Sequence, residues 1–135
     1  MSELTPVINN YLNGHRTGVL ATQNKSGVPQ QTLIAYHFDG TDLAISTRAP
    51  TLKAKNISAR PEVSLAITDG PKQLVVYGAT AVVRDEAEVL RLHQERIRQI
   101  ALRQETDEEL TERLRREERV VLILTPRRYF APNIE

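Results

Sequence analysis

The stretch Leu33-Ile34-Ala35-Tyr36-His37-Phe38 decides the fold, because apolar side chains occupy both its odd and its even positions. A strand with one face in water alternates apolar and polar side chains, so this stretch predicts a strand that is covered on both faces. The stretch from Val120 to Leu124 is apolar throughout. In a chain of 135 residues, such strands indicate a closed barrel whose outer surface is also covered. A helix can cover part of that surface, and a second copy of the chain is expected to cover the rest.

Turn and cap residues divide the remaining sequence. Thr5-Pro6 begins a helix with a capping hydroxyl and a proline at the first helical position, and Arg60-Pro61 ends another. Together they predict a mainly β (α+β) protein, a six-stranded antiparallel barrel with flanking helices, in a single domain over residues 1–135. The expected strands are 17–23, 28–38, 42–47, 62–68, 73–84 and 119–124, the last stopped by Thr125-Pro126; the expected helices are 5–12, 50–59, 85–105 and 107–116.

Composition excludes several classes of function. Eighteen basic and 17 acidic residues give a net charge of +1, which predicts neither a nucleic-acid nor a membrane-surface partner. Cysteine is absent, and three scattered histidines lack metal-ligand spacing, so no metal site is predicted. There is no Gly-rich phosphate loop, no Gly-x-Ser-x-Gly motif, and no apolar run near the roughly 18 residues of a membrane span. The first ten residues lack a signal-peptide pattern, and we expect a soluble, cytoplasmic protein.

The segment from Ile45 to Asn56 is the first candidate for chemistry. An apolar strand ends in the hydroxyls of Ser46 and Thr47, and a short helix then begins near Thr51. A helix N-terminus offers unpaired N–H groups and partial positive charge, to which Lys53 adds a full charge. This arrangement predicts a phosphate-binding site. A solvated basic helix explains the same pattern equally well.

Two other segments contain residues suited to a cofactor ring. Pro29 removes a ladder donor early in a strand, and Gln30 and Gln31 supply donors and acceptors for a heteroaromatic edge. On residue types alone, an ordinary edge strand explains them better. Gly78 lies inside a strand, which marks either a simple bend or the close approach of a ligand or another backbone.

Five runs carry a family resemblance when they are taken in order. They are Gly18 to Thr22, Gly27 to Gln30, Tyr36 to Gly40, Ser46-Thr47 continued by Lys53 to Ile57, and Arg60 to Leu65. In these runs the chain resembles the pyridoxamine 5′-phosphate oxidase-like split-barrel superfamily. It is most similar to the branch of small flavin and deazaflavin oxidoreductases, many of which use coenzyme F420. The resemblance extends from about Leu12 to Tyr129.

The resemblance implies a split β-barrel homodimer with two cofactor sites at the subunit interface. It implies that Lys53 and Asn56 meet the cofactor phosphate or tail, with Ser46, Thr47 and Thr51 as hydroxyl partners and Arg48 and Lys55 as further cations. It also implies that Pro29, Gln30, Gln31 and Thr32 line one side of the ring, and that Gln73, Tyr77 and Gly78 come from the partner chain.

The sequence also departs from the oxidases. They similarly show a Ser-Arg-Lys-Ala run, whereas this chain has Thr51-Leu52-Lys53-Ala54, with leucine in place of the phosphate-binding arginine. Arg48 lies close enough in sequence to substitute for it. Neither the arginine-containing strand motif nor the C-terminal arginine motif of the oxidases is matched. These differences argue against vitamin B6 oxidation and favour F420 over FMN.

The resemblance therefore predicts an F420-dependent reductase that transfers a hydride between the reduced deazaflavin and a small conjugated organic substrate. The alternatives are an FMN-binding oxidoreductase of the same family and a non-catalytic module that binds a flavin or a tetrapyrrole such as haem. No catalytic residue is assigned. Tyr36, His37 and solvent remain open as proton donors.

Overall fold

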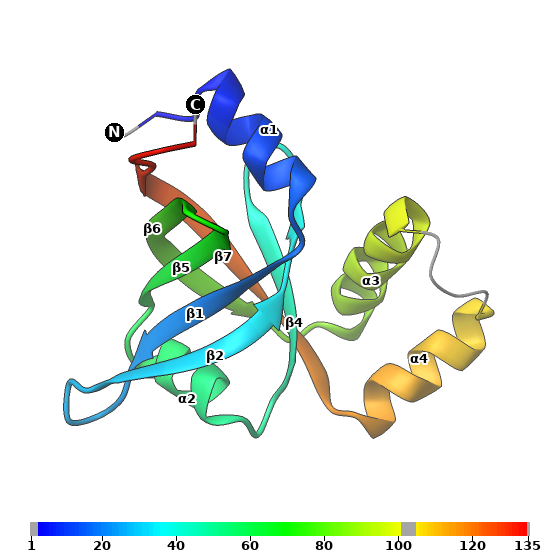
Figure 1. Ribbon diagram of the computed structural model, residues 1–135. Coiled ribbons are helices and arrows are strands. Elements are labelled where there is room, and N and C mark those ends of the chain that lie inside the picture. Colours follow the sequence, from blue (N-terminus) through cyan, green and yellow to red (C-terminus); the bar gives the residue numbers. More distant parts are fainter. Residues whose placement is uncertain (1–2, 101–104, 135) are drawn as a thin grey trace.

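The computed structural model describes residues 3–100 and 105–134, in which four helices accompany one antiparallel sheet of seven strands (Figure 1). The sheet order is β2-β1-β5-β6-β7-β4-β3. No helix in the described ranges combines the length and the apolar character that crossing a membrane requires. The strands are β1 (Thr17–Gln23), β2 (Pro29–Ala35), β3 (His37–Phe38), β4 (Leu43–Arg48), β5 (Glu62–Asp69), β6 (Lys72–Val83) and β7 (Arg119–Phe130), and the helices are α1 (Pro6–Gly14), α2 (Leu52–Ala59), α3 (Glu86–Ile100) and α4 (Asp107–Arg116).

The two edges of the sheet, β2 and β3, are successive pieces of one chain segment. Only Tyr36 separates them, and its N–H donates a hydrogen bond of 2.8 Å to the carbonyl of Arg16. β2 pairs with β1, whereas β3 pairs with β4, so this segment closes the sheet into a barrel. The strand expected over 28–38 is therefore divided at Tyr36, because its two halves pair with different neighbours. This division is why the structure has seven strands where six were expected, and the split-barrel prediction is confirmed.

The barrel interior holds the main hydrophobic core. Inward positions alternate along each strand, and the helices α1 and α2 lie at opposite ends of the barrel (Figure 1). Thr5 caps α1 by accepting a hydrogen bond of 3.2 Å from the Ile8 N–H, which directs Ile8 and Leu12 into the core. The residues that lose all or nearly all exposure include Leu20, Leu43, Ile45, Leu65, Ile67, Leu74, Val76, Leu122 and Leu124.

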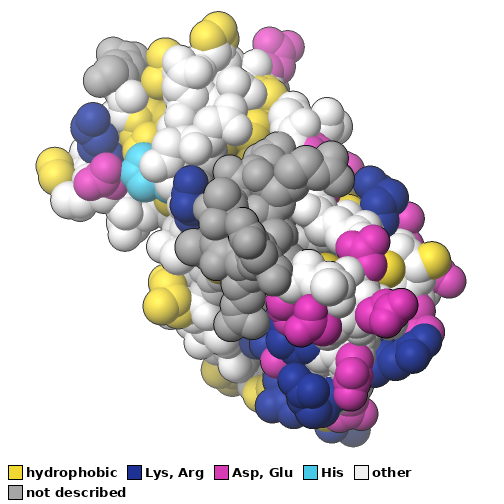
Figure 2. Space-filling model, turned by 90° about the vertical axis from the view of Figure 1, so that its right-hand side faces the viewer, with side chains coloured by type: hydrophobic (Ala, Val, Ile, Leu, Met, Phe, Trp, Pro, Cys, Tyr) yellow, Lys and Arg dark blue, Asp and Glu magenta, His cyan; other side chains and the backbone are white. Residues whose placement is uncertain are grey.

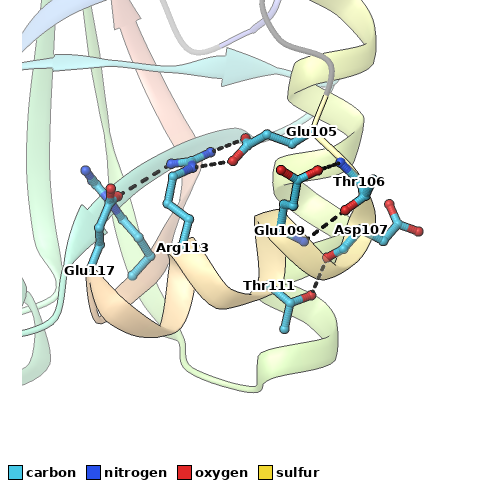
Figure 3. Close-up of polar contacts among 8 residues, drawn as sticks. Glu105, Thr106, Asp107, Glu109, Thr111, Arg113 and Glu117 are labelled. Carbon is cyan, nitrogen blue, oxygen red and sulfur yellow. Dashed lines mark hydrogen bonds and ion pairs between the residues drawn. The ribbon is translucent and has the colours of Figure 1, made fainter.

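A second, smaller cluster joins α3 and α4 to the outer face of β4 and β7. Val89, Leu110 and Leu114 pack against Val121 there. The chain enters α4 through a capping box, in which Thr106 and Glu109 exchange two hydrogen bonds of 3.1 Å (Figure 3). Acidic and basic side chains intermingle on the solvent side of these helices (Figure 2). The helix expected over 85–105 covers the barrel as α3, and residues 101–104 lie outside the described part of the chain.

The last strand extends past its predicted end. Thr125-Pro126 was expected to stop it, but β7 continues to Phe130. A register shift between Tyr77 and Gly78 places Gly78 opposite Pro126, and this bulge accommodates a residue that cannot donate to the ladder. A Cβ at Gly78 would overlap the carbonyl oxygen of Thr125 and lie 2.9 Å from Leu124 Cδ1. The close approach of the β7 backbone therefore explains why residue 78 is a glycine.

The sequence predicted that both faces of the stretch 33–38 are buried. For one subunit, this prediction is wrong at Leu33. Ile34, Tyr36 and Phe38 point into the core, whereas the Leu33 side chain is 72% exposed. The reason is that α3 and α4 cover only the β4–β7 part of the outer surface. The outer face of β1 and β2 carries no helix in the described part of the chain (Figure 1).

Gly78→Ala is expected to lower the free energy of unfolding by about 2 kcal/mol or more, because the new methyl group has no space beside β7. Gly14→Ala is the matched control, since a Cβ at Gly14 meets nothing within 4 Å and should change stability by less than about 1 kcal/mol. Urea denaturation of both variants measures the difference. Equal stability of the two variants would contradict the close approach.

Candidate functional site

The connection from β4 to α2 leaves a helix N-terminus without a side-chain cap. Thr47 is buried, and its Oγ1 lies 3.4 Å from the Oγ1 of Thr51, the residue that precedes the helix. The Thr51 hydroxyl donates a 2.8 Å hydrogen bond to the Arg48 carbonyl, and no side chain caps α2. The amides of the first turn therefore lack a side-chain acceptor, and two hydroxyls lie beside them. Such an end favours an anion.

Lys53, in the first turn of α2, is a half-buried cation without a counter-ion. It forms no hydrogen bond or ion pair with any residue that the structure describes. Burial lowers the pKa of the Lys53 amine, and the positive charge of Arg119 lowers it further. A negatively charged group bound here would relieve both effects. The surroundings of Lys53 therefore fit the phosphate of a cofactor.

Other cations and hydroxyls of the segment engage elsewhere in this subunit. Strand alternation turns Ser46 outward to α3, where its Oγ lies 2.7 Å from His93 Nε2. His93 Nδ1 donates to the Val89 carbonyl at 2.8 Å, so Nε2 of the neutral ring accepts the Ser46 hydroxyl. Arg48 Nε donates to the Glu117 carbonyl at 3.1 Å. Lys55 is exposed, and its side chain forms no hydrogen bond or ion pair with a described residue.

Asn56 belongs to a buried chain of hydrogen bonds that ties α2 to the barrel. Its Nδ2 donates to Thr22 Oγ1 at 3.1 Å, and the Thr22 hydroxyl donates to Gln30 Oε1 at 3.3 Å. Gln30 Nε2 then donates to Thr32 Oγ1 at 2.9 Å. The network joins three of the predicted site residues, Gln30, Thr32 and Asn56, through one residue that the sequence did not single out, Thr22. An inward polar residue after inward Gly18 and Leu20 is the signal that could have identified it.

The four residues predicted to line the ring do not share one face. Gln30 and Thr32 point into the barrel and belong to the network just described. Pro29 and Gln31 alternate with them along β2, and both are exposed on the outer surface. Only Pro29 and Gln31 are therefore available to a molecule that approaches from outside the barrel.

The residues predicted to come from a partner chain lie away from Lys53. Gln73 pairs with Thr68 at the β5–β6 hairpin, whose Asp69 binds His15 at 3.0 Å just after α1. Lys53 lies in α2, which covers the opposite end of the barrel (Figure 1). Tyr77 faces outward, and the guanidinium carbon of Arg128 lies 4.4 Å from its ring centroid. One subunit alone therefore does not bring Gln73 together with Lys53.

A row of apolar side chains crosses the uncovered outer face of the sheet. The register pairs Leu33 with Val19, Val19 with Ala66, Ala66 with Val75, and Val75 with Phe130. Directly paired residues share a face, so these five form one stripe across five strands. Leu33, Val19 and Phe130 are exposed large hydrophobic residues. The neighbouring row contains Gln31, which was predicted to line the ring, and Tyr77, which was predicted to come from the partner chain, so two predicted site residues flank the stripe.

The two side chains considered as proton donors differ in their surroundings. The Tyr36 hydroxyl is buried and donates to the Leu12 carbonyl at 2.7 Å. Burial raises the pKa of Tyr36, and the neighbouring Tyr11 raises it further, so Tyr36 retains its proton. His37 Nε2 is buried and has no hydrogen-bond partner among the residues that the structure describes.

A cavity of about 260 Å3 opens between the first residues of β7 and the helices α3 and α4. Ala49 and Arg119 line it on the side of the β4–α2 connection, and Val89, Leu90 and Leu114 supply apolar walls. It is large enough for a small organic molecule, and Arg119, the neighbour of Lys53, forms part of its rim.

Residues 4–131 match the pyridoxamine 5′-phosphate oxidase family. The chain belongs to this family. Family members bind flavins and include oxidoreductases, and the predicted resemblance is thereby confirmed at that level. No curated protein matches the chain significantly by sequence.

Solved structures share the fold over nearly the whole chain. A conserved hypothetical protein from Mycobacterium tuberculosis is 25% identical, with a TM-score of 0.79 over 96% of this chain and 85% of that one. An F420 reductase is 22% identical, with a TM-score of 0.66 over 85% and 89% of the two chains. HutZ, the haem storage protein from Vibrio cholerae, is 17% identical, with a TM-score of 0.68 over 96% and 94%.

Thr22→Val is expected to lower the free energy of unfolding by about 1–3 kcal/mol, because Asn56 loses its acceptor and Gln30 its donor. Thr68→Val makes the same change at an exposed position of β5 and should stay within about 0.5 kcal/mol of wild type. Urea denaturation compares the two. A Thr22→Val protein as stable as wild type would refute the structural role of the network.

Proposed function

We propose that this protein is an F420-dependent oxidoreductase that transfers a hydride between the reduced deazaflavin and a small conjugated organic substrate. The observation that carries this proposal is the half-buried Lys53, which has no partner among the described residues, at the uncapped N-terminus of α2 beside the hydroxyls of Thr47 and Thr51. Membership of a flavin-binding family makes the phosphate of such a cofactor the fitting anion. The whole chain, residues 1–135, would form the cofactor-binding domain.

The surroundings of α2 support the deazaflavin over FMN. Leu52 occupies the position where the oxidases similarly carry an arginine, and its side chain is 53% exposed. Arg48, the nearest substitute, donates to the Glu117 carbonyl instead. Among the described residues, Lys53 is the cation in the first turn of α2, and an FMN phosphate, with its double negative charge, would be better matched by two there. The F420 reductase among the structures of the same fold agrees with this choice.

The proposal includes a homodimer formed through the apolar stripe. A soluble subunit gains by covering Leu33, Val19 and Phe130, and the five-strand stripe presents the same surface to a second copy. Gln31 and Tyr77 border this stripe, so pairing two copies brings predicted site residues to the interface. Gln73 of one subunit would then approach the Lys53 site of the other. The complete site would thus need both subunits.

In this arrangement the protein binds and orients, and a bound deazaflavin supplies the hydride chemistry. Lys53 and the first-turn amides of α2 would hold the phosphate, while Asn56, through its bond to Thr22, holds α2 on the barrel. Pro29 and Gln31 would border the ring from the outer face of β2. The cavity beside Ala49 would admit the substrate.

Lys53→Ala is expected to weaken the binding of the preferred cofactor by about tenfold or more, because a charge-assisted contact to the phosphate is lost. The free energy of unfolding should change by less than about 0.5 kcal/mol, since Lys53 has no partner in the described structure. Separate fluorescence titrations with F420 and FMN measure both affinities, and Lys72→Ala, an exposed lysine on β6, is the control.

The titrations also separate the alternatives. Preference for FMN would replace the deazaflavin by the flavin in the same site. Binding of haem in place of both, as the fold of HutZ suggests, would replace oxidoreduction by storage. Turnover of the reduced F420 complex with a panel of conjugated substrates tests catalysis itself. Equal cofactor affinity of the wild type and Lys53→Ala would reject the phosphate site.

Leu33→Glu is expected to shift the protein from dimer to monomer, because it places a charge at the most exposed apolar position of the stripe, at its β2 end. Val7→Glu changes an exposed apolar residue on α1, outside the stripe, and should leave the dimer intact. Sedimentation velocity gives the mass of each variant. A wild-type monomer, or a dimer that tolerates Leu33→Glu, would exclude this interface.

A further inference from the structure

A second cavity, which is polar and has a volume of about 100 Å3, lies where α1 ends, between the Tyr36–Phe38 segment and α3. His15, Arg16, His37 and Arg96 supply its titratable side chains together with Tyr36. Its lining contains no aspartate or glutamate. Asp69 binds His15 Nε2 at 3.0 Å from outside this lining, so among the described residues the guanidinium groups of Arg16 and Arg96 are the cations of the cavity without a carboxylate partner.

Arg96 is the main evidence for a ligand. It is half-buried and forms no hydrogen bond or ion pair with any residue in the described ranges. Burial lowers the pKa of Arg96, and the charges of Arg119 and Arg113 lower it further. These two neighbours are themselves neutralised, because Arg113 binds Glu105 at 3.0 and 3.1 Å (Figure 3) and Arg119 binds Glu117 at 2.9 Å. Arg96 thus lacks the carboxylate that both neighbours have.

His37 provides an independent indication. Among the described residues, its Nε2 is the one buried polar side-chain atom without a hydrogen-bond partner. The side chain is nine-tenths buried, with 10% of its surface exposed. Glu95 Oε1 lies 4.0 Å away, too far for a hydrogen bond, and the other Glu95 oxygen binds Arg91 at 3.2 Å. An additional hydrogen-bonding group would satisfy this nitrogen.

Hydrogen bonds hold the walls of the cavity in place. The Tyr36 hydroxyl binds the Leu12 carbonyl at 2.7 Å, and the Tyr36 N–H binds the Arg16 carbonyl. His15 Nδ1 donates to the Tyr11 carbonyl at 2.7 Å, and the two rings stack with centroids 4.0 Å apart. These contacts join α1, β1 and the barrel closure. The cavity is therefore preformed, which limits the entropic cost of binding.

We propose that this cavity binds a small oxyanion, a phosphate or carboxylate group, held mainly by the guanidinium groups of Arg96 and Arg16. Guanidinium is the side-chain group best suited to such anions, because its planar N–H groups match their oxygens. The cavity lies at the α1 end of the barrel, whereas Lys53 lies in α2 at the other end (Figure 1). The proposal does not depend on the cofactor site.

Titration with inorganic phosphate, and separately with acetate, at constant ionic strength in chloride tests the proposal. Phosphorus NMR reports phosphate binding to the full chain, and the shift of the unfolding midpoint reports both anions. Arg96→Gln should weaken binding by about tenfold or more. Arg127→Gln removes an exposed arginine on β7 and should bind as wild type does. Lys53→Ala should also retain the binding, which separates this cavity from the cofactor site.

Arg16→Gln is the second test, because Arg16 is exposed and its removal leaves the core unchanged. It should weaken binding in the same direction as Arg96→Gln. Absence of binding of either anion to wild type, or unchanged affinity in both arginine variants, would overturn the proposal. So would loss of the anion response in Lys53→Ala, since it would assign the response to the α2 site.

Discussion

The closure of the sheet at Tyr36 is the constraint on which the rest of the structure depends. One chain segment supplies both edge strands, since β2 pairs with β1 and β3 pairs with β4, so the two edges of the sheet meet at Tyr36. Tyr36 secures the change of partner with its N–H on Arg16 and its hydroxyl on Leu12. Those two contacts also hold α1 over one end of the barrel. The hydrophobic core, the position of α1 over one end of the barrel and the polar cavity beside Tyr36 all depend on this closure.

The cations on the surface of this barrel differ in whether a described carboxylate pairs with them. Arg113 and Arg115 of α4 and Arg119 at the start of β7 have carboxylate partners. Lys53 and Arg96 are half-buried and have none among the described residues, which costs folding free energy. A cation that is retained at such a cost is best explained by an anion that binds it. Lys53 lies in α2, whereas Arg96 lies in α3 and lines the polar cavity at the end of α1, which is why two separate ligand sites follow from them.

The elements that the sequence predicted well are those governed by local chemistry. Thr5-Pro6 and Thr106 marked helix starts, and the hairpin residues marked strand ends, because caps and turns act within a few residues. The end of β7 was predicted wrongly, since Pro126 is tolerated only because a bulge opposite Gly78 removes the need for its N–H. Leu33 was expected to be covered on the same grounds as Ile34, yet it stays 72% exposed in the described part of one subunit.

Within the candidate site, the sequence by itself determined the residue types and the helix start that suit a phosphate, with Lys53 directly after Thr51 and Leu52. Only the tertiary structure decided which side chains face the same space. Strand alternation separated Gln30 from Gln31 and turned Ser46 away from Thr47, and sheet register placed Thr22 beside Asn56. Arg96 and His37 share a cavity for the same reason. Contacts between residues far apart in the chain depend on closure and register, which no local pattern of residues contains.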